Sequence, residues 1–159
     1  MRAYVALGSN LGDRAGYLAR ARAALAALPG TRVRGASRLY QTDPVGPPGQ
    51  GPYLNQVLRL ETGLPPGALL RAMLAIEREN GRVRTVRFGP RTLDLDLLDW
   101  GGLAIRAPGL VLPHPRLHLR AFVLVPLAEL DPAWRHPRLG RTAAGLLRRV
   151  DRRGVRPYP

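Results

Sequence analysis

The sequence contains no cysteine and no lysine. Without cysteine the chain forms no disulfide and no thiolate metal site, and the redox compartment stays undecided on this ground. Without lysine it has no Schiff-base chemistry and no phosphate-binding loop of the G-x-x-x-x-G-K type. A side chain that clamps phosphate must therefore be arginine, whose planar guanidinium suits bidentate contacts to phosphate oxygens.

Aromatic residues are scarce, at 6%, and 11 acidic residues face 25 basic ones, for a net charge of +14. Because every basic residue is arginine, and alanine, leucine, glycine and proline abound, we attribute the excess to compositional bias and weigh only where arginines cluster. No apolar run approaches the length of a membrane span. No export signal is visible, so we expect a cytoplasmic protein with no membrane partner.

Hydrophobic periodicity and turn residues predict a single domain over residues 1–159, because the chain is long enough for one core. The expected order is strand, helix, strand, strand, helix, strand. This order is typical of the ferredoxin-like βαββαβ sandwich, an α+β fold whose antiparallel sheet carries both helices on one face. The other face stays available for a ligand or for a C-terminal extension. The six predicted elements span residues 2–7, 13–28, 31–40, 53–62, 65–80 and 92–99.

The pattern is weaker after residue 100. It predicts a short hairpin near 103–105, an apolar run over 122–127, a helix over 142–150 and a poorly ordered tail over 152–159. Two long polar loops, 43–52 and 81–90, interrupt the domain. Long loops in a compact domain often bind ligands and close over them.

Two aspartates stand two residues apart in a leucine-rich run, residues 91–98 (RTLDLDLL). The leucines alternate with polar residues, which is the period of a β-strand, so Asp94 and Asp96 should lie side by side on one face. Carboxylates this close repel each other unless a cation lies between them, and Mg²⁺ prefers such oxygen ligands. The alternative is a solvated strand face without a metal.

Four arginines precede the aspartates, in a loop punctuated by glycine and proline. Carboxylates for a metal beside arginines for phosphate indicate a site for a metal-bound polyphosphate. Plain surface arginine is the alternative, and for Arg87 it is the interpretation we prefer. The four are Arg82, Arg84, Arg87 and Arg91.

Four stretches, in this order along the chain, resemble the 6-hydroxymethyl-7,8-dihydropterin pyrophosphokinase family of folate biosynthesis. They are residues 6–13 (ALGSNLGD); 40–44 (YQTDP) with 53–55 (YLN); Glu77 with 81–84 (GRVR) and 88–96 (FGPRTLDLD); and 112–115 (LPHP) with 120–124 (RAFVL). The third stretch is highly specific, and four at matching spacings are strong. The resemblance extends from Ala3 to about Leu147.

The resemblance implies an ATP-dependent diphosphotransferase. It would move the β,γ-diphosphate of ATP onto the hydroxymethyl group of the pterin and release AMP. Asp94 and Asp96 would hold two Mg²⁺ ions that bridge the triphosphate. Arg82 and Arg91 complete the catalytic set, with Arg82 stabilising charge on the transferring group. No strong general base is evident; proximity to the metal would activate the hydroxymethyl oxygen, with Asp94 as a candidate proton acceptor.

The resemblance also implies two sets of binding residues. Those for ATP are Glu77, Arg82, Arg84, Arg91, Leu97, His114 and Arg120. Those for the pterin are Thr42, Pro44, Val45, Tyr53, Asn55 and Phe122. The two aromatic rings would sandwich the flat pterin, and Asn55, which both donates and accepts, would read its edge. Core packing is the alternative for the aromatic residues, as is an exposed helix carboxylate for Glu77.

Some positions depart from the family pattern. Many members carry tryptophan where this chain has Phe88, and the arginine loop is one residue shorter than in some members. Leu74, Gly109 and Val111 stand where some members have polar side chains near ATP. We assign Gly8 to turn geometry. No departure removes a metal ligand, so we predict an active, monomeric enzyme with ATP and the pterin as partners and no nucleic acid.

Two alternatives stay open from the sequence. A basic ferredoxin-like domain is also typical of RNA-binding modules, but these need exposed aromatics in a motif of the K/R-G-F/Y type, which is absent here. An ordinary γ-phosphoryl kinase or a nucleotidyltransferase would use the same metal pair. The released product distinguishes these reactions: diphosphoryl transfer releases AMP, a γ-phosphoryl kinase releases ADP, and nucleotidyl transfer releases pyrophosphate.

Overall fold

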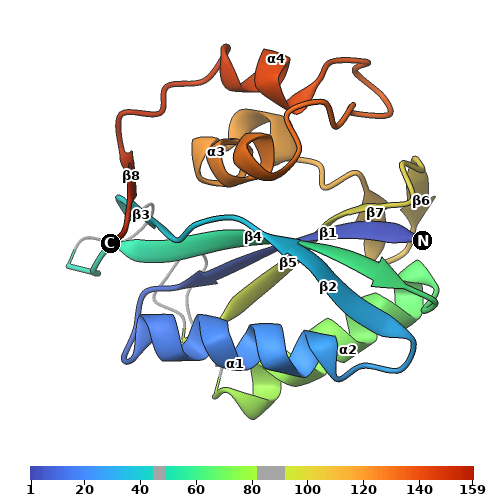
Figure 1. Cartoon of the computed structure of the whole chain (residues 1–159), viewed down its shortest axis with the longest axis horizontal. Coiled ribbons are helices and arrows are strands. Elements are labelled where there is room, and N and C mark those ends of the chain that lie inside the picture. The colour runs from blue at the N-terminus through green and yellow to red at the C-terminus, as the bar shows by residue number, and fades with distance from the viewer. Residues whose placement is uncertain (45–48, 82–91) are drawn as a thin grey trace.

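A computed structural model describes residues 1–44, 49–81 and 92–159. Its main sheet has the strand order β5-β1-β4-β3-β8, with β2 also paired to β4, and every pair is antiparallel (Figure 1). The elements are β1 (Arg2–Ser9), α1 (Arg14–Ala26), β2 (Thr31–Ala36), β3 (Tyr40–Thr42), β4 (Tyr53–Thr62), α2 (Pro66–Glu79), β5 (Asp94–Trp100), β6 (Ile105–Ala107), β7 (Leu110–Leu112), a 3₁₀ turn (Leu117–Leu119), α3 (Ala121–Leu130), α4 (Ala143–Leu147) and β8 (Val155–Pro157).

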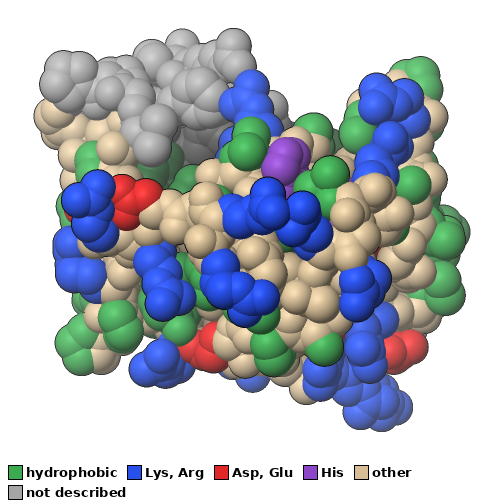
Figure 2. Space-filling view, turned by 90° about the horizontal axis from the view of Figure 1, so that it is seen from above, with side chains coloured by type: hydrophobic (Ala, Val, Ile, Leu, Met, Phe, Trp, Pro, Cys, Tyr) green, Lys and Arg blue, Asp and Glu red, His purple; other side chains and the backbone are tan. Residues whose placement is uncertain are grey.

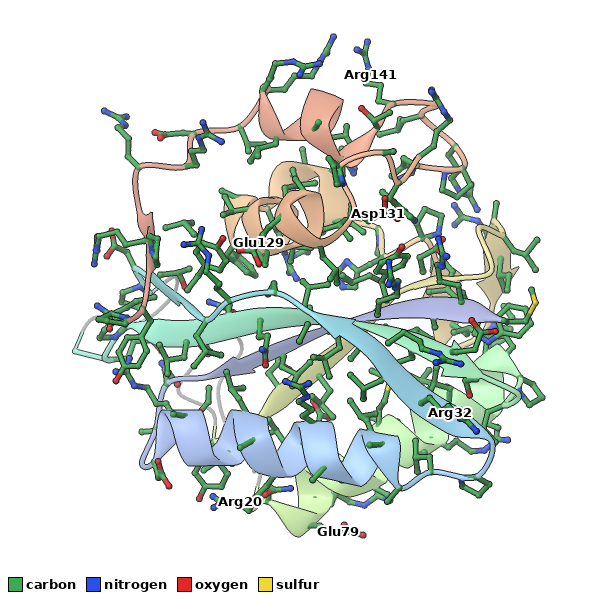
Figure 3. All side chains as sticks on the ribbon, in the orientation of Figure 1. Arg20, Arg32, Glu79, Glu129, Asp131 and Arg141 are labelled. Carbon is green, nitrogen blue, oxygen red and sulfur yellow. The ribbon has the colours of Figure 1, made fainter. Side chains whose placement is uncertain are left out.

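Helices α1 and α2 cover one face of the sheet, which confirms the predicted ferredoxin-like arrangement (Figure 1). Asp13 caps α1, because its carboxylate accepts the Gly16 amide at 3.1 Å. Arg20 of α1 and Glu79 of α2 point away from the sheet (Figure 3). The apolar faces of both helices pack with alternate strand residues into one core, which includes Leu7, Leu18, Leu25, Leu58, Leu69, Met73, Leu95 and Leu97.

Helices α3 and α4 lie on the other face of the sheet (Figure 1). The apolar run 122–127 belongs to α3, which packs between the sheet and α4 and is therefore hydrophobic on most of its circumference. A second core forms here from Tyr4, Leu98, Leu124, Trp134 and Leu146. Tyr4 donates its hydroxyl to Asp131 at 2.5 Å and so joins β1 to the end of α3.

Three predicted boundaries were wrong. The strand expected over 31–40 is divided into β2 and β3, because Ser37 pairs with Val57 through both its backbone amide (2.9 Å) and its hydroxyl (3.0 Å). The hairpin expected near 103–105 comprises β6 and β7, which turn at Gly109 with φ of 73°. The helix expected over 142–150 is shorter, as Thr142 caps α4 and the helix ends at Leu147.

The tail expected to be poorly ordered was also wrong. Residues Val155–Pro157 form β8, which pairs with β3 at one end of the sheet (Figure 1). Hydropathy could not indicate this strand, because a three-residue strand with one charged residue has no resolvable period. Pairing with β3, and not its own hydrophobic pattern, stabilises β8.

Arginines are spread over the face that carries α3 and α4, with apolar and neutral surface between them (Figure 2). This distribution agrees with a compositional origin for the net charge of +14. Within residues 1–44, 49–81 and 92–159, no helix has the length and apolar content that crossing a membrane requires.

Candidate active site

The two aspartates of β5 lie on the sheet face that carries α3. Leu95 and Leu97 are each only 5% exposed and point into the core beneath α1 and α2. Asp94 and Asp96 alternate with them and are half-buried, while Leu98 continues their row into the α3-side core. The predicted side-by-side placement on one strand face is thus present.

A row of paired residues crosses the sheet beside Asp94. Gly8 of β1 pairs with Asp94 on one side and with Asn55 of β4 on the other. Directly paired residues point to the same face, so the carboxylate and the amide face the same space with no side chain between them. Gly8 is not at positive φ, so glycine supplies space here and not turn geometry, which corrects our assignment.

A cavity of about 170 Å³ lies over this row. Asn55 donates to the Thr42 hydroxyl at 2.7 Å, which fixes the orientation of the amide at the cavity wall. The lining residues are Ala6, Leu7, Gly8, Thr42, Asp43, Tyr53, Asn55, Asp94, Asp96, His114, Arg120 and Phe122. Two aromatic rings, one amide and the carboxylate pair of β5 together suit a flat, polar-edged ligand with a reactive group near Asp94 and Asp96, while Asp43 adds a third carboxylate to the wall.

A second cavity, of about 380 Å³, adjoins the first. Leucine and valine are the commonest residue types in its wall, which is formed by Leu70, Leu74, Asp94, Leu95, Asp96, Leu97, Gly109, Leu110, Val111, Leu112 and His114. Asp94, Asp96 and His114 line both cavities. A ligand in each cavity would therefore meet the other ligand at the carboxylate pair.

His114 and Arg120 approach Asp96 from the α3 side. His114 Nε2 lies 3.9 Å from Asp96 Oδ1, and an Arg120 guanidinium nitrogen lies 3.7 Å from Oδ2. His114 Nδ1 accepts the Arg116 amide at 3.1 Å, which leaves the ring proton on Nε2. Burial, and next the Arg120 charge, lowers the pKa of His114 to about 4. The imidazole is thus a neutral donor at pH 7.

Arg120 and Phe122 are placed together by the start of α3. Arg120 is the N-cap residue of the helix, and its guanidinium lies 5.4 Å from the centre of the Phe122 ring. A cation over a ring face is attracted to it, so each side chain restricts the other. The start of α3 thus presents one charged and one aromatic group to the cavity.

Glu77 is buried, at 2% exposure, so the alternative of an exposed helix carboxylate was wrong. Its Oε2 accepts the backbone amide of Leu95 at 2.8 Å. Leu95 lies between the two aspartates on β5, which stands at the end of the strand order and pairs with β1. Glu77 therefore holds the strand segment that carries the carboxylate pair.

Comparison with known proteins identifies the family. The sequence profile of 7,8-dihydro-6-hydroxymethylpterin-pyrophosphokinase (HPPK) matches residues 4–132. The chain belongs to this family. It is 46% identical over 158 residues to the 2-amino-4-hydroxy-6-hydroxymethyldihydropteridine pyrophosphokinase of Pseudomonas aeruginosa, covering 99% of this chain and 97% of that protein. It is 43% identical over 155 residues to the Synechocystis protein of the same name, covering 98% and 79%.

The fold comparison agrees. The crystal structure of Plasmodium falciparum HPPK-DHPS superposes with a TM-score of 0.73, at 14% identity. It covers 93% of this chain, which spans 44% of that longer chain. Membership of the HPPK family confirms the resemblance, and it does not favour an RNA-binding module.

Most residues predicted for the HPPK site lie at the two cavities. Thr42, Tyr53, Asn55 and Phe122 line the first cavity, and Leu97 lines the second. Pro44 is exposed after β3 and does not line either. The residues Val45, Arg82, Arg84, Arg87, Phe88 and Arg91 lie outside the described part of the chain.

Sequence reasoning missed several lining residues. Leu74, Gly109 and Val111, noted only as departures, line the second cavity. Asp43, Ala6 and Leu70 were not predicted at all, although Ala6 is two residues from Gly8 on the same strand. Alternate residues of a strand point to the same face, so Ala6 could have been predicted from Gly8. Asp43 and Leu70 reach the cavities through tertiary contacts that the sequence pattern does not indicate.

The carboxylate pair fits a hard divalent cation. The described residues contain no group of three or more histidine, cysteine or acidic side chains placed to bind a metal. Mg²⁺ commonly takes one or two protein carboxylates and completes its shell with water and substrate phosphates. A pair of carboxylates at the junction of two ligand cavities matches this donor set.

Proposed function

We propose that this chain transfers the β,γ-diphosphate of ATP to the hydroxymethyl group of 6-hydroxymethyl-7,8-dihydropterin and releases AMP, a step of folate biosynthesis. One observation carries the proposal beyond family membership: two cavities of different character share Asp94, Asp96 and His114. The first cavity, with its two aromatic rings and one amide, suits the pterin, and the second, with its leucine and valine residues beside polar surface, suits the adenine and ribose. The triphosphate then lies at the carboxylates.

The pterin is held by residues of β3, β4 and α3. Its ring lies between Tyr53 and Phe122, and Asn55, oriented by Thr42, reads its polar edge. Backbone groups of Thr42, Pro44 and Val45 contact the same edge. Gly8 leaves room for the hydroxymethyl group to reach the side of the carboxylates.

ATP is held by residues of α2, β5 and the segment before α3. Leu97, which lines the second cavity, contacts the nucleotide there, Glu77 lies near the ribose, and His114 and Arg120 contact phosphate oxygens as neutral and charged donors. Arg84 adds a phosphate contact from the loop. Arg82 and Arg91 act on the transferring group, where charge develops.

In the reaction the hydroxymethyl oxygen forms a bond to the β-phosphorus. The bond from that phosphorus to the oxygen bridging to the α-phosphate breaks, and AMP leaves with this oxygen. Asp94, which lines both cavities, accepts the hydroxyl proton. Asp94 and Asp96 would hold two Mg²⁺ ions, which would supply charge neutralisation and alignment of the triphosphate.

Product analysis tests this function. The purified protein is mixed with ATP, Mg²⁺ and 6-hydroxymethyl-7,8-dihydropterin, and the released nucleotide is identified by chromatography. Pterin-dependent AMP supports diphosphoryl transfer. Pterin-dependent ADP would indicate a γ-phosphoryl kinase, pyrophosphate would indicate nucleotidyl transfer, and neither outcome fits the proposal.

We also propose that the chain works as a monomer and without nucleic acid. Light scattering after size exclusion should then give a mass near 17.4 kDa. Filter binding with RNA should show only weak affinity that falls steeply with salt, as expected for non-specific contacts of a basic protein. A dimer mass or salt-resistant RNA binding would contradict these two statements.

A further inference from the structure

β8 holds the short strand β3 from outside the pterin cavity. β3 has three residues, and β8 pairs with all of them on the edge opposite β4. Further bonds extend the contact at both ends: the Asp43 amide donates to the Gly154 carbonyl at 3.2 Å, and the Tyr158 amide donates to the Leu39 carbonyl at 2.9 Å. Figure 1 shows β8 beside β3 at this end of the sheet.

Side chains reinforce the pairing around Asp43. An Arg156 guanidinium nitrogen lies 3.6 Å from Asp43 Oδ1. A Cβ built on Gly154 would lie 3.0 Å from Asp43 Oδ2, so the backbone of Gly154 approaches this carboxylate closely. Arg156 and Asp43 are more than half exposed, and such an ion pair contributes little by itself.

The loop that follows β3 is tied to the same assembly. The Arg14 guanidinium lies 5.6 Å from the centre of the Tyr158 ring and donates to the Pro52 carbonyl at 2.9 Å. Pro52 precedes β4, so Arg14 links the segment after β8 to the far end of the 43–52 loop. Both ends of this loop are then held by contacts that involve residues 154–158.

β3 in turn carries part of the pterin cavity. Thr42 and Asp43 line it, and the Thr42 hydroxyl orients the Asn55 amide. A strand of three residues has few bonds to β4, so its second partner contributes a large share of what fixes its position. The second cavity lies at the opposite edge of the sheet, since β5 and β8 are the two ends of the strand order.

We propose that β8 is a positioning strand for the pterin: by pairing with β3 and restricting Asp43, it holds Thr42 and Asn55 where they bind the pterin edge. This inference rests on the proposed function for the identity of the ligand. It predicts a selective effect: a change in β8 weakens pterin binding and leaves nucleotide binding unchanged. The profile match to residues 4–132 does not include this strand.

The test uses Gly154→Val and a matched control, Gly63→Val. A Cβ at Gly154 would require the Asp43 carboxylate to shift by a few tenths of an ångström, and the branched side chain of valine adds to this, whereas the nearest atom to a Cβ at Gly63 is 3.9 Å away, and Gly63 is exposed. Dissociation constants are measured by calorimetry for the dihydropterin and for a non-hydrolysable ATP analogue with Mg²⁺. For Gly154→Val we expect the dissociation constant of the dihydropterin to rise about tenfold over that of the wild type, and the dissociation constant of the ATP analogue to change by less than about twofold. Gly63→Val should bind both ligands like the wild type.

Deletion of residues 153–159 is the second variant, and it should shift pterin binding in the same direction by more. Thermal unfolding and circular dichroism report whether each variant is folded. Unchanged pterin binding in both variants, or a parallel loss of pterin and nucleotide binding, would overturn the inference. A wild-type protein that releases no AMP would overturn the proposed function instead, while the selective effect on binding still decides the role of β8.

Discussion

A side chain at Gly8 would meet Asn55: a Cβ built there lies 3.1 Å from Asn55 Oδ1 and 3.6 Å from the Tyr53 ring. Contacts of 3.1 Å are tighter than carbon and oxygen normally adopt, so the amide would have to move. Asn55 has little freedom to do so, because it donates to Thr42 at 2.7 Å. Because Gly8 has no side chain, it leaves space in the first cavity, which we propose binds the pterin.

We expect Gly8→Ala to raise the pterin KM about tenfold, because the methyl group occupies cavity space and displaces the Asn55 amide. The backbone of Gly8 is not in the left-handed region, so alanine itself causes no backbone strain. Steady-state kinetics with either substrate varied measure the effect, and Gly63→Ala is the control. A raised ATP KM with an unchanged pterin KM would refute the cavity role.

Asp96→Asn should lower turnover by several orders of magnitude. The amide keeps the shape of the side chain but loses the charge that would bind a divalent cation and that faces His114 and Arg120. Calorimetric Mg²⁺ titration in the presence of an ATP analogue checks the binding step, and AMP release checks turnover. Asp151→Asn is the control, since Asp151 is exposed and pairs with Arg153 at 2.7 Å. Activity like the wild type in Asp96→Asn would remove the metal role.

Glu77→Ala should reduce the free energy of unfolding by about 1–3 kcal/mol, because the buried Leu95 amide would lose its acceptor. Glu77→Gln should recover most of this stability, since its amide oxygen accepts the same bond. Urea unfolding measures stability, and kinetics measure turnover. If Gln restores stability but not ATP affinity, the carboxylate charge itself acts on the nucleotide. If Gln restores both, Glu77 acts by holding β5.

The stability of the protein should fall as the pH is lowered through the histidine range. Burial, and next the charges of His118 and Arg138, lowers the pKa of His136 below its ordinary value of 6.5. A lowered folded-state pKa means that the neutral ring stabilises the fold above pH 6.5, and that this contribution is lost as the unfolded state takes up a proton.

The comparison variant is His136→Asn, whose Oδ1 can accept the amides that Nδ1 accepts from Arg138 and Leu139 at 3.2 and 3.1 Å. Its free energy of unfolding should depend less on pH between about 5 and 7 than that of the wild type. Urea unfolding across this range gives the slope of the free energy of unfolding against pH for the variant and for the wild type. Equal slopes would show that His136 does not titrate on unfolding.

Much of the fold was predictable because its causes are local. Period-two leucines around Asp94, a helix-capping Asp13 and the proline that opens α2 each act within a few residues. The break between β2 and β3 was not predictable, since it depends on Ser37 bonding to Val57 of another strand. The orientation of Glu77 was missed for the same reason, because its partner lies on β5.

The sequence by itself determined that two carboxylates share a strand face, that arginine is the cation available for phosphate, and which family the motifs resemble. Only the tertiary structure decided that Gly8 separates Asp94 from Asn55, that α3 brings Arg120 to Asp96, and that β8 pairs with β3. The physical reason is the range of the interactions. Periodicity and capping act between neighbours in sequence, whereas strand pairing and helix docking join segments whose mutual placement depends on packing of the whole chain.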